Sequence, residues 1–105
     1  MSAFACWRAQ GSFAVDGETF KIDQKIEHSK EYLFPGGKFI LKFTVTAGKK
    51  KVHNMKFTLE EKKGVTLTTV TTGEEEIEEN RSNDIYAKGL PGQANSIITL
   101  KLTSI

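Results

Sequence analysis

The residues with the clearest chemical potential lie in one acidic run, TTGEEEIEENRSND, over residues 71–84. Its glutamates crowd around a single apolar residue, Ile77: they are Glu74, Glu75, Glu76, Glu78 and Glu79. Carboxylate oxygens are ligands that Ca²⁺ takes, about six to eight at a time. Calcium loops, however, use short Asp and Asn side chains around a glycine that makes a sharp turn, and that spacing is missing here. The run therefore predicts no metal site.

The acidic run has two other interpretations: a solvated strand edge, and a docking face for a basic partner. If the run is a strand, its side chains alternate between two faces. One face carries Glu74, Glu76 and Glu78, and the other carries Ile77 between Glu75 and Glu79. This pattern indicates an exposed strand or loop with an apolar anchor. Charges on an edge strand also repel a second copy and so protect its unpaired backbone from aggregation. Both interpretations stay open from the sequence.

Residues for catalysis are few. Cys6 is the only thiol, and His28 and His53 are the only imidazoles. A nucleophilic Cys–His pair needs hydrogen-bond reach and a third, orienting group, and a zinc site needs ligands at characteristic spacings. Each of the three stands alone along the chain, and no hydrolase, zinc-protease, phosphate-loop or dinucleotide motif is present. The sequence predicts a protein that is not an enzyme and that uses no metal or cofactor.

Basic residues cluster at Lys49–Lys51 and at Lys62–Lys63, but the net charge is only +2, from 15 basic and 13 acidic residues. Nucleic-acid binders gain affinity by neutralising phosphates, so this balance argues against a nucleic-acid partner. If 38–47 and 52–60 form a hairpin, the two clusters lie at its opposite ends. An acidic edge of one copy could also face the Lys49–Lys51 turn of another, which would give a homo-oligomer or an open filament.

Three apolar residues are candidates for either core or contact surface. Trp7 is the lone tryptophan, and such a residue more often fills the core of a β domain than anchors a partner. Phe34 and Leu90 lie beside the turns LFPGG and KGLPGQ. There they form either a binding tip or a plug for the open end of the fold, and both alternatives stay open.

The elements that must position these residues are strands, because apolar residues alternate with polar ones almost throughout. In KFILKFTVTA (38–47) one face is Phe39, Leu41, Phe43, Val45 and Ala47, which indicates a half-buried strand. Asp16-Gly17 predicts a tight hairpin turn, since it supplies two positive-φ positions. The predicted strands are 3–8, 11–16, 18–24, 38–47, 52–60, 65–71, 84–88 and 95–104.

Two breaks in the alternation predict irregular backbone. Val70 is out of step with Leu67, which predicts a β-bulge near Thr68-Thr69 or an earlier strand end. Val52 is likewise out of step with Met55, which predicts a bulge or the end of a turn. Residues 25–33 (KIEHSKEYL) carry no helix cap or long apolar stripe, and we expect strand or loop there.

The bulk properties set the class of protein. A chain of 105 residues has the size of one domain, 1–105, with one core. One cysteine permits no internal disulfide, which favours a reducing compartment, and the N-terminus lacks the pattern of a signal peptide. No apolar run approaches the roughly 20 residues that span a bilayer. We therefore expect a cytoplasmic protein without a transmembrane segment.

Short strands, turns about every eight to twelve residues and no helix predict an all-β, immunoglobulin-like antiparallel sandwich of seven to eight strands. The stretch KFILKFTVTAG, a basic turn, then VHNMKFTLEEKKGVTL (38–67) resembles the middle strands of cytosolic immunoglobulin-like domains. Adaptor appendage domains and the major sperm protein domain are examples. The resemblance lies in patterning and implies a fold, with no functional residues carried over.

These observations predict a non-enzymatic module for protein interaction or assembly, with a protein partner. One alternative is a protease inhibitor that presents the LFPGG and KGLPGQ loops. Another is a sugar- or lipid-binding sandwich, which requires an exposed aromatic row built from Tyr32, Phe34 or Tyr86. The residues expected to bind a partner are Glu74, Glu75, Glu76, Glu78, Glu79, Lys49, Lys50, Lys51, Phe34 and Leu90.

Overall fold

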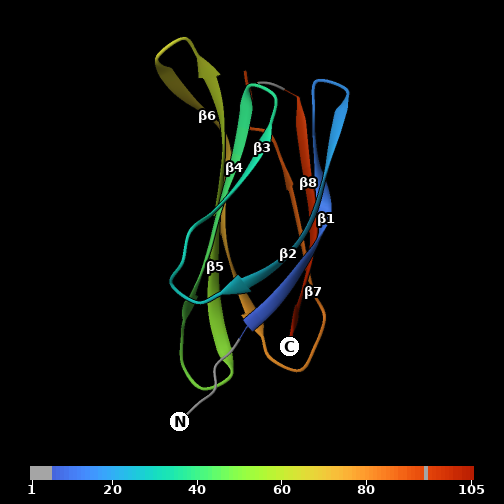
Figure 1. Cartoon of the computed structure of the whole chain (residues 1–105), viewed down its shortest axis with the longest axis vertical. Helices are drawn as coiled ribbons and strands as arrows, with labels where there is room; N and C mark the ends of the chain where they lie inside the picture. Colours follow the sequence, from blue (N-terminus) through green and yellow to red (C-terminus); the bar gives the residue numbers. More distant parts are fainter. Residues whose placement is uncertain (1–5, 94) are drawn as a thin grey trace.

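Two antiparallel sheets of four strands each pack face to face along the long axis of the molecule (Figure 1), in a computed structural model that describes residues 6–93 and 95–105. Residues 3–5 of the predicted first strand lie outside this range. The described residues contain no helix, which confirms the all-β prediction. The strands are β1 (Cys6–Val15), β2 (Glu18–Glu27), β3 (Tyr32–Gly36), β4 (Phe39–Ala47), β5 (Val52–Lys63), β6 (Thr66–Glu78), β7 (Asn83–Lys88) and β8 (Ser96–Ser104).

The strand order is that of a meander. One sheet, called sheet A, has the order β2-β1-β8-β7, and the other, sheet B, has the order β3-β4-β5-β6. Every neighbour is adjacent along the chain except β8, which returns to pair with β1. An immunoglobulin sandwich instead interleaves its strands between the sheets through Greek-key connections. The sandwich-like arrangement is therefore confirmed, whereas the immunoglobulin-like type is not.

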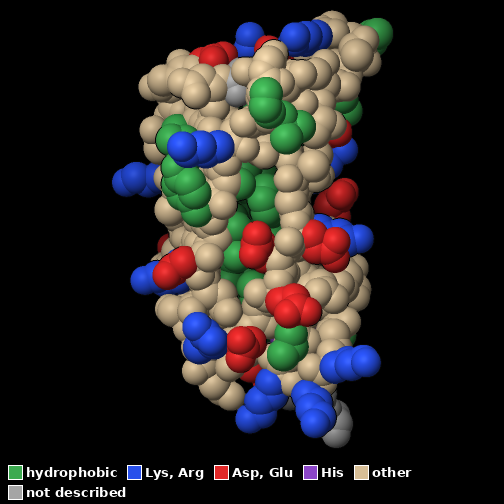
Figure 2. Space-filling view, turned by 180° about the vertical axis from the view of Figure 1, so that it is seen from behind, with side chains coloured by type: hydrophobic (Ala, Val, Ile, Leu, Met, Phe, Trp, Pro, Cys, Tyr) green, Lys and Arg blue, Asp and Glu red, His purple; other side chains and the backbone are tan. Residues whose placement is uncertain are grey.

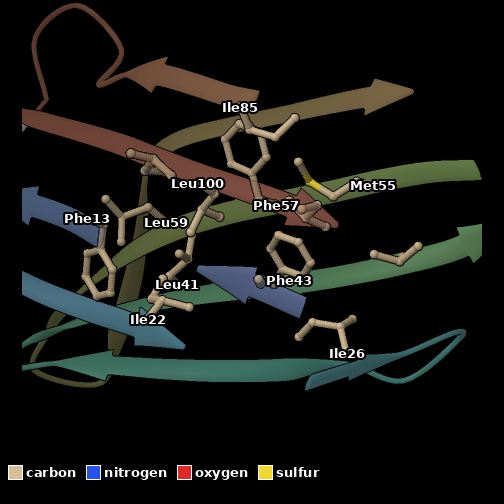
Figure 3. Packing of buried hydrophobic residues seen from close by; sticks show 14 of the residues in the cluster. Phe13, Ile22, Ile26, Leu41, Phe43, Met55, Phe57, Leu59, Ile85 and Leu100 are labelled. Atoms are coloured by element: carbon tan, nitrogen blue, oxygen red, sulfur yellow. The ribbon is translucent and has the colours of Figure 1, made fainter. Parts of the chain in front are cut away.

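The core lies between the sheets and is built from the apolar face of nearly every strand. Figure 3 shows Phe13, Leu41, Phe43, Leu59 and Leu100 pointing into this layer from strands of both sheets. Burial alternates along β4 from Phe39 to Thr46 and along β8 from Ser96 to Leu102, as the period-two pattern predicts, whereas Ala47, expected on the buried face, is exposed at the end of β4. Trp7 is fully buried, which confirms its assignment to the core.

Strand β1 differs from the prediction because it runs unbroken where two strands were expected, at 3–8 and 11–16. Gly11 lies in its middle with φ of 150°, a backbone conformation that L side chains rarely adopt. The predicted gap at Ala9-Gln10 is absent, because both residues pair with β2 and β8, and Gly11 keeps the same register opposite Ile22 and Leu100. The Asp16-Gly17 turn that follows is confirmed, with φ of 51° and 83° at its two residues.

One of the two predicted irregularities is present, one residue later than the predicted place near Thr68-Thr69. Leu59 of β5 pairs with Thr71 while Glu60 pairs with Thr69, so Val70 is the extra residue of a β-bulge. The other prediction is wrong, because β5 keeps a continuous register with β4 from Glu61 to His53. His53 and Met55 are both buried there, and Val52 is simply a residue of the opposite face.

A glycine in β6 makes room for a core aromatic ring. A Cβ atom added at Gly73 would lie 2.5 Å from Cζ and 2.8 Å from Cε1 of Phe57, whose ring is buried. We expect Gly73→Ala to lower the free energy of unfolding by about 1–3 kcal/mol, since a buried ring has little space to retreat. Urea unfolding measures this. Adding Phe57→Leu to Gly73→Ala should recover part of the loss in a double-mutant cycle, and strictly additive losses would contradict the clash.

Candidate interaction surface

Strand β6 is the exposed edge of sheet B and carries most of the acidic run. It pairs only with β5, and its predicted end at residue 71 is too early, because the strand continues to Glu78. Lys56 of β5 stands opposite Glu74, and Asn54 stands opposite Glu76. The acidic run is thus an extended edge strand, one of the two conformations expected for it.

The two parts of the acidic run differ in their burial and in their ion pairs. Ile77 is fully buried and anchors the end of β6 in the core. Oε2 of Glu78 forms an ion pair with Nη1 of Arg81 at 3.3 Å, and Oε2 of Glu79 lies 2.6 Å from Nε2 of His53. The three carboxylates that precede Ile77 are exposed and have no ion pair within the described part of the chain. They are Glu74, Glu75 and Glu76.

The backbone of the same segment is open on its outer side. The N–H of Glu78 donates to Oδ1 of Asn83 at 3.0 Å, and its carbonyl accepts from Nδ2 at 2.9 Å. Both groups therefore point away from β5, and in an antiparallel strand alternate residues share this direction. The outward N–H and C=O groups of Glu76 and Glu74 have no hydrogen-bond partner among residues 6–93 and 95–105.

The open edge borders a seam where the two sheets are not joined by strand pairing. At one end of the seam Leu90 N donates to Val70 O at 2.8 Å, and at the other end Asn83 holds Glu78. Figure 2 shows this side of the molecule, with hydrophobic side chains in a hollow and acidic side chains around it. Glu75 lies two residues before Ile77 and therefore on the same, inward face of β6. Its side chain is nevertheless exposed, so it places a charge beside the seam.

The lysine turn lies beside the acidic strand within one molecule. Lys51 accepts a hydrogen bond from the N–H of Glu79 through its carbonyl at 3.0 Å. Lys49 and Lys50 line an open hollow whose wall also includes Glu76. The contact between the two runs that the sequence suggested for separate copies is therefore available inside a single chain. Lys62–Lys63 lies at the far end of β5, as the hairpin requires.

Phe34 and Leu90 do not form one tip. Phe34 belongs to β3, is half-buried and packs against Phe43 with a ring-centroid distance of 6.5 Å. Leu90 is bonded to β6, and β3 and β6 are the opposite edges of sheet B. The sequence LFPGG is thus part of an edge strand, where Pro35 removes a donor from the open side. Leu90 remains exposed beside the seam.

A cluster that the sequence did not predict lies near the end of β6. Nε1 of Trp7 donates to Nε2 of His28 at 3.0 Å, and the rings of His28 and His53 have centroids 4.6 Å apart. Nε2 of His53 in turn contacts Glu79. Each residue stands alone in the sequence, so no spacing pattern signals this cluster. Cys6 alternates with the inward-facing Trp7 and so points to the other side of the sheet.

The described residues hold no group of three or more His, Cys, Asp and Glu side chains placed to bind a metal ion. Among the same residues, no helix has the length and hydrophobicity required to cross a membrane. Comparison with known proteins finds no matching family model, no matching curated protein and no matching solved structure.

Proposed function

We propose that the protein is a non-enzymatic interaction module that binds an extended, basic segment of a protein partner along the β6 edge. The observation that carries the proposal is that three exposed carboxylates, at Glu74–Glu76, coincide with the outward backbone groups of Glu74 and Glu76, none of which has a partner among the residues that the structure describes. Strand addition at a sheet edge uses main-chain hydrogen bonds for affinity and alternate side chains for specificity. The single cysteine accords with a reducing, cytoplasmic setting.

The charges select the kind of partner. Two copies of β6 that paired edge to edge would place glutamates opposite glutamates, and like charges directly opposite are destabilising. A segment with lysine or arginine at alternate positions would instead align its cations with the carboxylates of Glu74 and Glu76. The same charges that protect the edge from self-association therefore favour a basic partner over a second copy.

The alternative functions have less support. In a loop-presenting inhibitor the LFPGG and KGLPGQ segments would protrude, but the first is a paired strand and Leu90 of the second is bonded to β6. A sugar- or lipid-binding face would need its aromatic residues in one row. Tyr32 and Phe34 are half-buried in β3 of sheet B, whereas Tyr86 is exposed in β7 of sheet A.

A synthetic peptide tests the proposal directly. We expect a short peptide that alternates lysine with threonine to bind and to shift the backbone amide resonances of Thr72, Glu74 and Glu76 in a heteronuclear NMR titration. A peptide of the same sequence and charge in which every backbone amide nitrogen is methylated has no main-chain N–H donor, so it should bind more weakly whichever way the strand runs. Equal binding of both peptides would show charge attraction without strand addition and would contradict the proposal.

Neutralising the three carboxylates should weaken this binding. We expect the triple variant Glu74→Gln, Glu75→Gln, Glu76→Gln to lose about tenfold or more in affinity, or about 1.4 kcal/mol, in low salt. The control variant carries the same change at the exposed Glu18, Glu27 and Glu31, away from β6, and has the same net charge. Equal losses in both variants, measured by isothermal titration calorimetry, would assign the effect to net charge alone.

A further inference from the structure

The cluster of Trp7, His28, His53 and Glu79 plays no part in the proposed edge binding, and its hydrogen-bond chemistry is sensitive to protons. The indole Nε1–H can only donate, so Nε2 of His28 must accept and must carry no proton. The proton of the neutral His28 ring is therefore on Nδ1. The arrangement holds one specific protonation state of this ring in place.

Protonation of His28 would break the contact with Trp7. A proton on Nε2 would make two N–H donors face each other at 3.0 Å, where neither can accept. Trp7 is fully buried and His53 nearly so, and neither side chain has space to move away. His28 is half-buried at the end of β2, so it is the member of the cluster that can leave.

The chain after His28 crosses from one sheet to the other through an exposed turn. Ser29 has φ of 60° in an exposed turn that carries the chain from sheet A to sheet B. Two hydrogen bonds flank the turn, from Ser29 N to Val45 O at 2.8 Å and from Glu27 N to the Tyr32 hydroxyl at 3.0 Å. A solvent-exposed turn of this kind can open locally while the core stays folded.

The groups around His28 act in opposite directions. Burial lowers the pKa of His28 below its ordinary value of 6.5, the neighbouring His53 lowers it further, and Glu79 opposes both. Two other titratable residues on the neighbouring strands are Cys6 and Glu27, which stand opposite each other in the pairing of β1 with β2, and Glu78 forms an ion pair with Arg81. Lys30 contacts the Tyr32 ring, and Lys51 is exposed.

We propose that Trp7, His28, His53 and Glu79 form a proton-sensitive latch, which fastens the crossing between the two sheets at neutral pH and releases it when His28 takes up a proton. The pKa of His28 is lower in the closed state than in the open state. The latch therefore contributes its full stability above pH 6.5. That contribution is lost as the pH falls from there through the lowered pKa of the closed state.

Hydrogen exchange measures the opening at one atom. We expect the protection factor of the Ser29 amide to fall by up to about tenfold for each pH unit below 6.5, and then to level off. The fluorescence of Trp7, the only tryptophan, should change over the same range, because Nε1–H loses its acceptor. A protection factor that stays constant between about pH 8 and about pH 5 would overturn the latch.

The variant His28→Gln separates the latch from general acid destabilisation. The glutamine amide oxygen can accept from Trp7 but does not titrate in this range, so both signals should become flat with pH. Ile85→Val, in the core, should lower stability at every pH without moving the midpoint. If His28→Gln follows the wild-type pH curve, the latch is refuted.

The wild-type protein supplies a second measurement in case His28→Gln does not fold. NMR titration of the His28 ring should give a midpoint below pH 6.5, at the pH where the Ser29 protection factor levels off, and a midpoint at or above pH 6.5 would refute the latch. Binding of the lysine–threonine peptide to the β6 edge at neutral pH is a separate readout. Failure of the latch therefore leaves the proposed edge binding unaffected, and the reverse also holds.

Discussion

Gly11→Ala should lower the free energy of unfolding by about 3 kcal/mol or more, because both the backbone conformation and the neighbouring strand exclude a side chain at this position. The φ of 150° is unfavourable for any residue with a Cβ atom, and the added Cβ would lie 2.1 Å from the carbonyl oxygen of Thr99. That oxygen belongs to the backbone of β8 and cannot rotate away. Relief would require β1 and β8 to separate at the centre of sheet A.

Urea unfolding followed by circular dichroism measures this loss. The midpoint concentration should fall while the slope stays unchanged, as expected when stability alone is affected. The neighbouring Gln10→Ala is the matched control, since its side chain is exposed and should change stability by no more than about 0.5 kcal/mol. A Gly11→Ala protein as stable as this control would show that β1 does not need glycine at its centre.

Ile77→Ala should have the second largest effect, a loss of about 2–5 kcal/mol. Ile77 is fully buried although exposed glutamates precede and follow it. Its side chain attaches the end of β6 to the core opposite His53 of β5. Removing three carbon atoms leaves a cavity at this attachment, and the surrounding core can close it only in part.

The local consequence of Ile77→Ala is as specific as the global one. The N–H of Glu79, which donates to Lys51 O, should exchange faster in the variant because the end of β6 is no longer anchored. Glu75→Gln is the control, since Glu75 lies two residues away with the same parity but is exposed. It should change the free energy of unfolding by at most about 0.5 kcal/mol. Equal effects of the two changes would contradict the anchoring role of Ile77.

The period-two pattern predicted local structure well because it depends only on neighbouring residues. The strands around Phe43 and Leu100, the Asp16-Gly17 turn and the bulge at Val70 follow from alternation and turn preferences. The errors have local causes too. The gap predicted at Ala9-Gln10 is absent, and the close approach of the β8 backbone that requires glycine at position 11 is not visible in one sequence.

The candidate surface was predicted in part. The acidic run was identified as a strand edge or docking face, and the residues before Ile77 fit this description. Glu79 was grouped with them, but it is engaged with His53, which lies 26 positions away along the chain. Phe34 and Leu90 were grouped because both are apolar residues beside turns, yet opposite edges of sheet B separate them.

The sequence by itself determined that this chain forms strands, which face of each strand is apolar, and where the tight turns lie. These properties follow from side-chain alternation and from backbone preferences, which act over a few residues. Only the tertiary structure decided which strands are neighbours, which edge stays open, and that Trp7 and His28, 21 positions apart, share a proton-dependent hydrogen bond. Strand pairing uses backbone groups that are the same in every residue, so the side-chain pattern does not encode the order of the strands.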